Sequence, residues 1–275
     1  MILLTIVIPV YNDGEFLESC LSNIQSSKHL EIIVVDDGSS KTVKKPSRFD
    51  VSVIRQSHQG VLAARELGTQ RARGKYVWFV DVDDKIIQVP EITCLDSDMI
   101  RFASECGWMC VGNKIYSRKL ALHVFERLGS TKLATCEDGL FYLMAQKLAK
   151  NIVDKDFTIY QYIQRVNSVS HRFNPHIVEE RVCFIRKCRE LNLDINIVLF
   201  AKESFIHIVA CLYRWCPTWS DLRIICSELK KSIVYLEGKS AICADPYARR
   251  LLFAVEHPLF FYVYKRILHR CGKMS

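Results

Sequence analysis

Apolar residues in the first third of the chain form short runs that alternate with segments of helical spacing. The run at residues 3–10 is almost continuously apolar and rich in β-branched side chains, as in a strand buried on both faces. Shorter runs of the same kind follow, and between them apolar positions repeat every three or four residues over 15–24 and 61–71. The predicted strands are 3–10, 32–35, 51–54 and 76–80. This order predicts parallel strands joined by right-handed helical crossovers.

Beyond residue 84 the alternation continues and then gives way to helix. Strands are predicted at 99–103, 109–111 and 157–163, and helices at 118–128 and 138–150. From about residue 177 to the end of the chain the apolar spacing is helical. Turn signals interrupt it at 216–218, 237–239 and 257–258. The predicted fold class is α/β, followed by a mainly helical C-terminal region.

Composition changes this picture only a little. The chain has 275 residues, of which 49% are hydrophobic, enough for a large core. Apolar runs stay below the roughly 20 residues that span a bilayer, and the N-terminus has neither a basic segment nor a small-residue cleavage site. We therefore expect a cytoplasmic protein. Its twelve cysteines include no Cys-x-x-Cys pair, so we expect them to be reduced and structural instead of zinc ligands.

The net charge of +8 is unevenly placed. From Arg165 onward basic residues recur beside aromatic residues, notably at 213–215 and 262–270. Two interpretations remain open: peripheral contact with an anionic membrane, or ordinary amphipathic helices whose basic side chains face water. Nucleic acid is not an expected partner, because no recognised binding motif accompanies the charge.

The strongest chemical signal is the run 78–84, in which an apolar strand ends in three carboxylates. Asp81, Asp83 and Asp84 would repel one another unless a cation lay among them. Ligands bind at strand ends in open α/β sheets, and hard cations such as Mg²⁺ or Mn²⁺ take oxygen ligands together with phosphates. The run therefore predicts a site for a metal ion and a diphosphate.

Several motifs in the first 140 residues resemble, in order and spacing, those of family-two glycosyltransferases. They are TIVIPVYN at 5–12, IVVDDGS at 33–39, Ala64-Arg65 with Gly68, GKY leading to DVDD at 74–84, and Glu137-Asp138. The resemblance covers roughly residues 3–171, and is greatest to short bacterial enzymes that build capsule, lipopolysaccharide or other surface glycans. It implies a GT-A fold, with a mixed sheet flanked by helices. This domain would span 1–175, with its donor half at about 1–84 and its acceptor half at about 85–175. The helical region 176–275 would contact the acceptor or the membrane surface.

For the donor nucleotide, the resemblance implies that Pro9, Tyr11 and Asn12 lie beside the base, where an aromatic ring can pack on it. Asp37 would accept a hydrogen bond from the imide N–H of uracil, which favours a UDP-sugar. Two alternatives stay open: Tyr11 as plain core packing, and Asp37 as the residue that stabilises the turn after the second strand.

Two further donor contacts follow from the resemblance. Gln59-Gly60 resembles the loop that enters the helix after the third strand, and it would shape the donor pocket. Arg65 would face a phosphate, unless it is an ordinary solvated basic residue on its helix. The family often has Asn after the Ala-Arg pair, whereas this chain has Glu66, which leaves the local donor contact open.

The metal ligands are also implied by the resemblance. Asp81 would lie near the ribose and the metal, and Asp83 would bind the Mn²⁺ or Mg²⁺ that bridges the diphosphate. Asp84 would assist either task. His171 is a further candidate ligand, although a lone histidine is more often structural or exposed.

The catalytic base implied by the resemblance is Asp138. Inverting transfer needs a carboxylate opposite the leaving group to take the proton of the acceptor hydroxyl. Glu137 is the neighbouring alternative, and both acids could simply favour the start of a helix.

The function implied is metal-dependent, inverting transfer of one hexosyl or N-acetylhexosaminyl unit to a hydroxyl of a growing surface glycan or glycolipid. Arg214-Trp215 resembles the end of the Gln-x-x-Arg-Trp motif of processive synthases, but Cys211 stands at the glutamine position, so a non-processive enzyme is expected. The alternative is a catalytically inactive nucleotide-sugar-binding partner or regulator in a glycan assembly complex.

Overall fold

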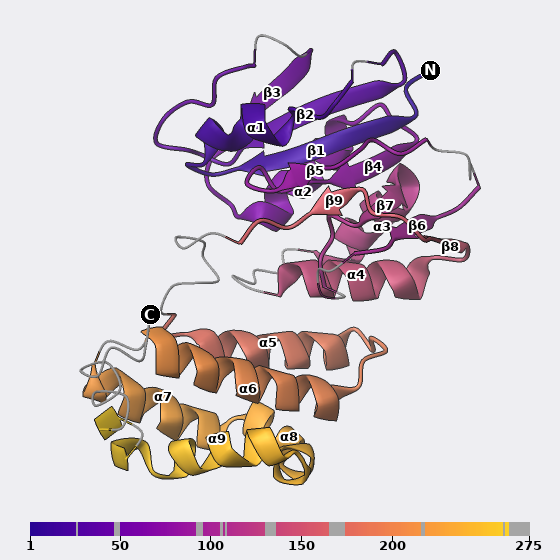
Figure 1. Cartoon of the computed structure of the whole chain (residues 1–275). Coiled ribbons are helices and arrows are strands. Elements are labelled where there is room, and N and C mark those ends of the chain that lie inside the picture. Colours follow the sequence, from indigo (N-terminus) through magenta and orange to yellow (C-terminus); the bar gives the residue numbers. More distant parts are fainter. Residues whose placement is uncertain are drawn as a thin grey trace. The chain divides into compact units, whose positions relative to one another are not determined.

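The computed structural model of the chain forms two compact units, Met1–Ile163 and Gln164–Ser275 (Figure 1). It describes residues 1–25, 27–46, 50–91, 96–104, 107, 109–129, 136–164, 174–215, 218–260 and 262–263, the side chains of Tyr213 and Trp215 excepted. The units divide after Ile163, whereas the domain boundary was expected at 175.

The N-terminal unit is built on a mixed seven-stranded sheet of order β3-β2-β1-β4-β7-β6-β8. Its strands are β1 Leu4–Val10, β2 Leu30–Asp36, β3 Val51–Arg55, β4 Tyr76–Phe79, β6 Met99–Phe102, β7 Lys114–Ser117 and β8 Ile152–Lys155. The first four are parallel, β7 runs antiparallel to β4 and β6, and β8 is parallel to β6. The α/β class and the mixed sheet flanked by helices are thus confirmed.

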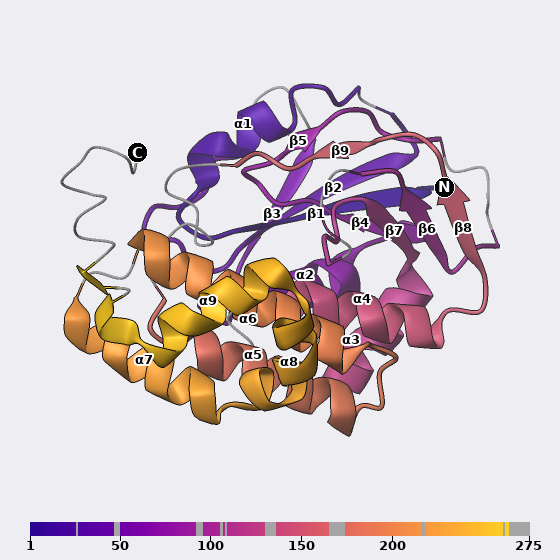
Figure 2. The ribbon, with the colours of Figure 1, turned by 60° about the horizontal axis from the view of Figure 1, so that its bottom comes forward.

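Different elements cover the two faces of this sheet (Figure 2). One face carries helices α2 Val61–Arg71, α3 Arg118–Leu128 and α4 Glu137–Leu148; the other carries η1 Gly14–Phe16, α1 Leu17–Cys20 and the small sheet of β5 Lys85–Ile86 and β9 Tyr160–Gln161. Alternate β1 side chains serve the two faces, since Ile6 joins the core cluster with α1 whereas Val7 meets α2. A Cβ on Gly68 would lie 2.3 Å from Val7 Cγ1, so glycine lets α2 pack directly on β1.

The helix expected over 15–24 is much shorter in the structure. After α1 the backbone bonds Ser22 N to Ser19 O and Ile24 N to Leu21 O join residues three apart, so the chain tightens into turns. Leu21 and Ile24 are still fully buried, which explains the helical spacing of the apolar residues.

Two predicted strands are wrong as placed. Residues 109–111 precede the strand β7, and the chain turns there because Lys114 N bonds to Val111 O at 3.1 Å and Trp78 Nε1 bonds to Gly112 O at 2.6 Å. Of the range 157–163 only Tyr160–Gln161 is strand, and the sheet strand β8 comes earlier. These apolar residues pack inward from turns, which short apolar runs do not distinguish from strands.

The C-terminal unit is helical, as expected. Its helices are α5 Ile177–Glu190, α6 Ile197–Trp215, α7 Trp219–Lys231, α8 Ile233–Ala244 and α9 Pro246–Glu256. The turn expected at 237–239 is wrong, because Gly238 is a buried residue inside α8. A Cβ there would lie 3.0 Å from Lys202 N, so this glycine allows α8 to approach the backbone of α6 closely.

The eight cysteines among the described residues are free of disulfide bonds, and four of them are buried. Burial raises the pKa of the Cys20 thiol to about 12, and its Sγ lies 3.7 Å from Asp81 O. That thiol stays protonated at neutral pH and packs as a small apolar side chain.

Candidate functional site

The carboxyl ends of β1, β2 and β4 lie together at one edge of the sheet, because these strands are parallel neighbours. Tyr11 and Asn12 follow β1, Asp37 follows β2, and Asp81 comes soon after β4, whereas Pro9 is buried within β1 itself. Ligands bind at such an edge in open α/β sheets. The residues expected to hold a nucleotide and a metal are therefore gathered on one edge.

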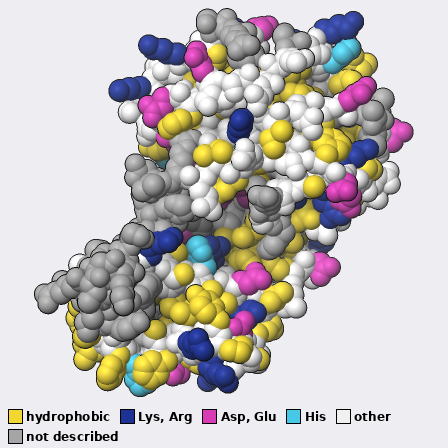
Figure 3. Space-filling model, in the orientation of Figure 1, with side chains coloured by type: hydrophobic (Ala, Val, Ile, Leu, Met, Phe, Trp, Pro, Cys, Tyr) yellow, Lys and Arg dark blue, Asp and Glu magenta, His cyan; other side chains and the backbone are white. Residues whose placement is uncertain are grey.

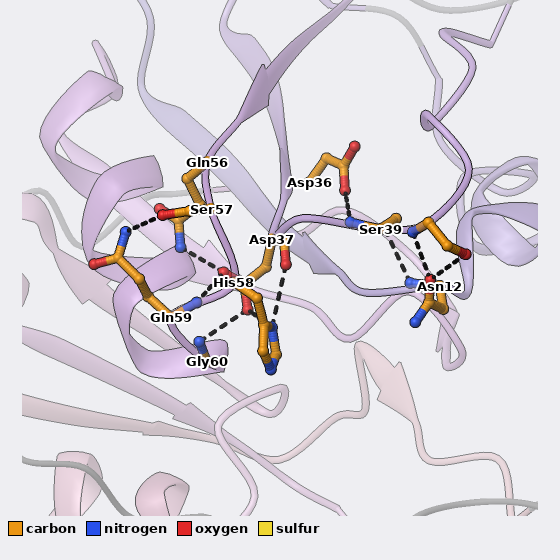
Figure 4. A network of polar contacts seen from close by, with 10 residues as sticks. Asn12, Asp36, Asp37, Ser39, Gln56, Ser57, His58, Gln59 and Gly60 are labelled. Carbon is orange, nitrogen blue, oxygen red and sulfur yellow. Dashed lines mark hydrogen bonds and ion pairs between the residues drawn. The ribbon is translucent and has the colours of Figure 1, made fainter.

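A network of hydrogen bonds joins the loops that follow β1 and β2 (Figure 4). Asn12, in the left-handed conformation with φ 64°, accepts from Ser40 N and Oγ at 2.8 and 2.9 Å and donates from its own N to Ser39 Oγ at 2.9 Å. Arg55 donates to Asp36 Oδ2 at 2.8 Å and to Ser39 O at 2.7 Å. Asn12 is thus occupied in shaping the edge.

Asp37 is almost fully buried and organises the loop between β3 and α2 (Figure 4). Its Oδ1 accepts from Gln56 Nε2 at 2.7 Å and Gln59 N at 2.8 Å, and its Oδ2 from Gly60 N at 2.9 Å. His58 Nδ1 lies 2.8 Å from the same Oδ2. A carboxylate has about four acceptor positions, so a base N–H would have to replace one of these contacts. The Gln56 and His58 side chains are the partners that a rotation could remove.

Tyr11 presents its ring at this edge instead of packing in the core. The ring is 46% exposed and stacks on the His58 imidazole, with centroids 4.0 Å apart and planes 21° apart. Two flat rings therefore meet beside the buried Asp37, a surface on which a nucleobase can stack. His58 was not predicted from sequence patterns, because its position depends on its contact with Asp37.

Arg65 connects the acid run to the candidate base. Its side chain is 2% exposed, and it donates from Nη2 to Asp81 Oδ1 at 2.7 Å and from Nη1 to Asp138 Oδ1. Burial alone would lower the pKa of Arg65, but the charges of Asp138 and Asp81 raise it above its ordinary value. Both outer nitrogens are engaged by carboxylates, so Arg65 is not a solvated residue, and its contact with a donor phosphate stays a prediction.

Glu137 and Asp138 lie in the first turn of α4, directly after Cys136, which has left-handed backbone at φ 63°. Asp138 retains 24% exposure, and its Oδ2 has no hydrogen-bond partner among the described residues. Glu137 Oε2 also has no hydrogen-bond partner in the described part of the chain, and it is buried. Burial, together with the charge of Asp138, raises the pKa of Glu137 to about 8. Burial also raises the pKa of Asp138, which Arg65 opposes.

The raised pKa of Glu137 predicts that stability falls as the pH rises. A glutamate in the unfolded chain titrates near its ordinary value of 4.5, whereas folded Glu137 holds its proton to about 8. Between these values the folded form binds more protons, so the free energy of unfolding decreases with pH, and below 4.5 this loss is absent. In Glu137→Gln the loss between about pH 5 and about pH 9 should shrink by at least about 1.4 kcal/mol, the value of one pKa unit. Urea unfolding followed by tryptophan fluorescence measures it.

The matched control for that titration is Glu126→Gln, which changes an exposed glutamate on α3. It should keep the pH dependence of the wild type. An equal loss of stability in the wild type and in Glu137→Gln would mean that Glu137 is ionised in the folded protein at neutral pH.

The three carboxylates after β4 have different surroundings. Asp84 is 4% exposed and accepts from Tyr160 Oη and from Ile163 N, the latter at 2.8 Å, so it anchors β9. Asp81 is 34% exposed and uses one oxygen for Arg65, and Asp83 is half-buried. Asp81 and Asp83 are therefore the two carboxylates of the run that are partly exposed at the edge.

These residues fit a metal that binds together with a diphosphate. Among the described residues no group of three or more His, Cys, Asp or Glu side chains could hold a metal ion. Mg²⁺ is commonly held by one or two carboxylates, with substrate phosphates and water completing its oxygen shell, and Asp81 and Asp83 are such a pair. His171, the further ligand expected, lies outside the described residues.

Comparisons with known proteins point to one family for the segment that forms this edge of the sheet. Residues 5–88 match the family model of glycosyl transferase family 2. Glycosyltransferase GlyA of Streptococcus pneumoniae is 41% identical over 93 residues, which cover 31% of this chain and 13% of that protein. The uncharacterized glycosyltransferase EpsJ of Bacillus subtilis is 36% identical over 92 residues, or 30% of this chain and 27% of that protein. The chain thus matches only about a quarter or less of these relatives' length. The resemblance to family-two glycosyltransferases is confirmed for residues 5–88.

Solved structures extend the likeness of fold to nearly the whole chain. Staphylococcus aureus TarS 1–349 in complex with UDP-GlcNAc has a TM-score of 0.55 at 17% identity, over 98% of this chain and 92% of that one. The mannosyltransferase PcManGT from Pyrobaculum calidifontis, in complex with GDP-Man and Mn²⁺, has a TM-score of 0.52 at 10% identity, over 96% and 86%. At such identities these likenesses concern the fold, which is GT-A-like.

Proposed function

We propose, from the match of residues 5–88 to the model of glycosyl transferase family 2, that the protein is a metal-dependent, inverting, non-processive glycosyltransferase. It moves one hexosyl or N-acetylhexosaminyl unit from a UDP-sugar to a hydroxyl of a growing surface glycan, of the capsule or lipopolysaccharide type, or of a glycolipid. It works in the cytoplasm, at the inner face of the membrane. One observation carries the proposal: Arg65 binds both Asp81 of the acid run and Asp138, the candidate base.

Donor binding begins with the nucleotide. The exposed Tyr11 ring, stacked on His58, offers a flat surface for the base beside Asp37. The choice of uridine is supported by the fold likeness to TarS, whose structure contains UDP-GlcNAc. Asp81 and Asp83 would hold the divalent ion, which when bound neutralises the charge of the leaving diphosphate. The Mn²⁺ in the PcManGT structure supports a divalent ion without deciding between Mn²⁺ and Mg²⁺.

Transfer then needs a base on the acceptor side. The acceptor oxygen bonds to the anomeric carbon while the bond from that carbon to the diphosphate oxygen breaks, which inverts the configuration. The acceptor proton passes to Asp138, whose Oδ2 is available because only Oδ1 contacts Arg65. Glu137, whose pKa burial raises to about 8, is mainly protonated at neutral pH and is the alternative base.

Calorimetric titration of the full chain with UDP, GDP and CDP, each with and without Mn²⁺, tests the donor site without a known acceptor. We expect UDP binding that requires Mn²⁺ and is weakened at least about tenfold in Asp83→Ala, because the variant lacks a ligand of the diphosphate-bound ion. Asp156→Ala, which removes an exposed acid from the turn before β9, is the control and should bind like the wild type.

The outcomes separate the possible functions. Preferential binding of GDP or CDP would overturn the uridine assignment, and failure of all three nucleotides to bind would overturn the transferase proposal. Mn²⁺-dependent UDP binding without turnover of UDP-glucose, UDP-galactose or their N-acetylated forms, in water or with glycolipid, would favour the inactive binding partner.

A further inference from the structure

The two units of the chain differ in charge. Residues 1–163 contain 20 Lys and Arg and 20 Asp and Glu, whereas residues 164–275 contain 18 and 10. The whole net charge of +8 therefore belongs to the helical unit. Such an imbalance attracts an anionic partner to this unit and not to the sheet unit.

The solvent side of α9 and of the residues after it is unusually apolar. Tyr247, Phe253 and Phe260 are 58%, 56% and 70% exposed. Tyr247, Arg250 and Phe253 are spaced three residues apart, which places them along one side of α9, and His257 and Phe260 follow the end of this helix at Glu256. The opposite side is already used, since Ala248, Leu252 and Val255 are buried in the bundle.

The rings of Phe253, His257 and Phe260 lie in contact one after another. The Phe253 and His257 rings have centroids 4.5 Å apart, and the His257 and Phe260 rings 6.5 Å apart. Leu259, beside them, is 59% exposed. We name Tyr247, Arg250, Phe253, His257, Leu259 and Phe260 the α9 outer face. Figure 3 shows hydrophobic side chains at the surface of the helical unit, with Lys and Arg side chains among them.

We propose that the α9 outer face docks on an anionic lipid membrane. Aromatic and aliphatic side chains at a helix surface enter the boundary between head groups and acyl chains, and basic residues beside them bind lipid phosphates. Arg249 and Arg250 are both exposed, and neither has an ion-pair partner among the described residues. This surface thus combines exposed apolar side chains, which can enter the membrane, with two arginines that have no ion-pair partner among the described residues.

Other occupants fit this face less well. A second copy of the chain would bring Arg249 and Arg250 against their own equivalents. It would also bring together two helical units that each carry a net charge of +8. A single-stranded nucleic acid would stack on the rings but gains little from Leu259. Membrane docking would keep the proposed enzyme beside a lipid-linked acceptor. This benefit rests on the proposed function, whereas the docking itself is argued from the α9 outer face alone.

Co-sedimentation of the full chain with vesicles tests the proposal. One set of vesicles contains phosphatidylcholine alone, and the other contains phosphatidylcholine with phosphatidylglycerol. We expect binding to the anionic set at least about tenfold stronger, and weaker binding as salt is raised. Phe253→Ser/Phe260→Ser and Arg249→Gln/Arg250→Gln should each weaken anionic binding about tenfold or more, the first by losing inserted rings and the second by losing head-group contacts.

The matched controls lie on the neutral unit. Lys44→Gln/Lys45→Gln removes two exposed charges, and Ile87→Ser removes a side chain that is 40% exposed. Both should bind vesicles like the wild type. Equal binding to both vesicle sets, or a loss in the controls as large as in the α9 variants, would overturn the proposal. Binding to oligo(dT) that the phenylalanine pair weakens equally would indicate a nucleic-acid surface instead. The α9 variants should still bind UDP as the wild type does, so failure here removes the membrane location but leaves the proposed transfer reaction standing.

Discussion

Asp138→Asn should lower kcat on the order of 10²-fold or more while leaving the affinity for UDP nearly unchanged. The amide keeps the size of the carboxylate and an oxygen for Arg65 Nη1, but it takes no proton from an acceptor hydroxyl. Initial rates at saturating donor, together with calorimetric titration of UDP, measure both quantities. A loss confined to kcat is the signature of a group that acts in transfer and not in donor binding.

The neighbouring acid supplies the control for this substitution. Glu137→Gln should keep kcat within a few-fold of the wild type, because the proton that Glu137 already carries at neutral pH makes it a weak base. The opposite result, with Asp138→Asn active and Glu137→Gln inactive, would transfer the base role to Glu137. Comparable loss in both would indicate that the two acids act as one pair.

Local pattern was sufficient for the elements of the donor edge. Helices α2 and α3 lie where the apolar spacing places them, at 61–71 and 118–128, and the four parallel strands are within two residues of their predicted ends. Each of these segments buries a regular stripe or a whole strand, so its period is visible in the sequence. The acid run was recognisable because three carboxylates come soon after the buried strand β4.

Roles that depend on contacts far apart in the sequence could not be predicted. Asp84 and Tyr160 are 76 residues apart, and their hydrogen bond makes Asp84 an anchor of β9 instead of an edge ligand. Arg65 and Asp138 are 73 residues apart, and neither has a pattern that specifies the other. Gly238 was interpreted as a turn because glycine usually interrupts helices, yet here it permits close packing of α8 on α6. Each case is decided by the packing of two elements.

The Arg65 guanidinium is expected to matter almost as much as the base itself. In Arg65→Lys we expect kcat to fall on the order of 10²-fold, since an ammonium keeps the charge but lacks the planar fork that joins Asp81 to Asp138. Arg71→Lys, an exposed position on the same helix, is the control and should be neutral. Urea unfolding of both variants separates lost activity from lost folding.

A double-mutant cycle then distinguishes the two roles open to Arg65. If the guanidinium acts by holding Asp138, the variant Arg65→Lys/Asp138→Asn should be about as active as Asp138→Asn alone, because the position of an amide that accepts no proton is of little consequence. If Arg65 instead contacts a donor phosphate directly, the two losses should multiply, and the affinity for UDP should fall in Arg65→Lys but not in Asp138→Asn. The ion pairs favour the first result, because both outer nitrogens of Arg65 are engaged by carboxylates and its side chain is 2% exposed. In that case Arg65 is the residue through which donor-side Asp81 and acceptor-side Asp138 keep their spacing.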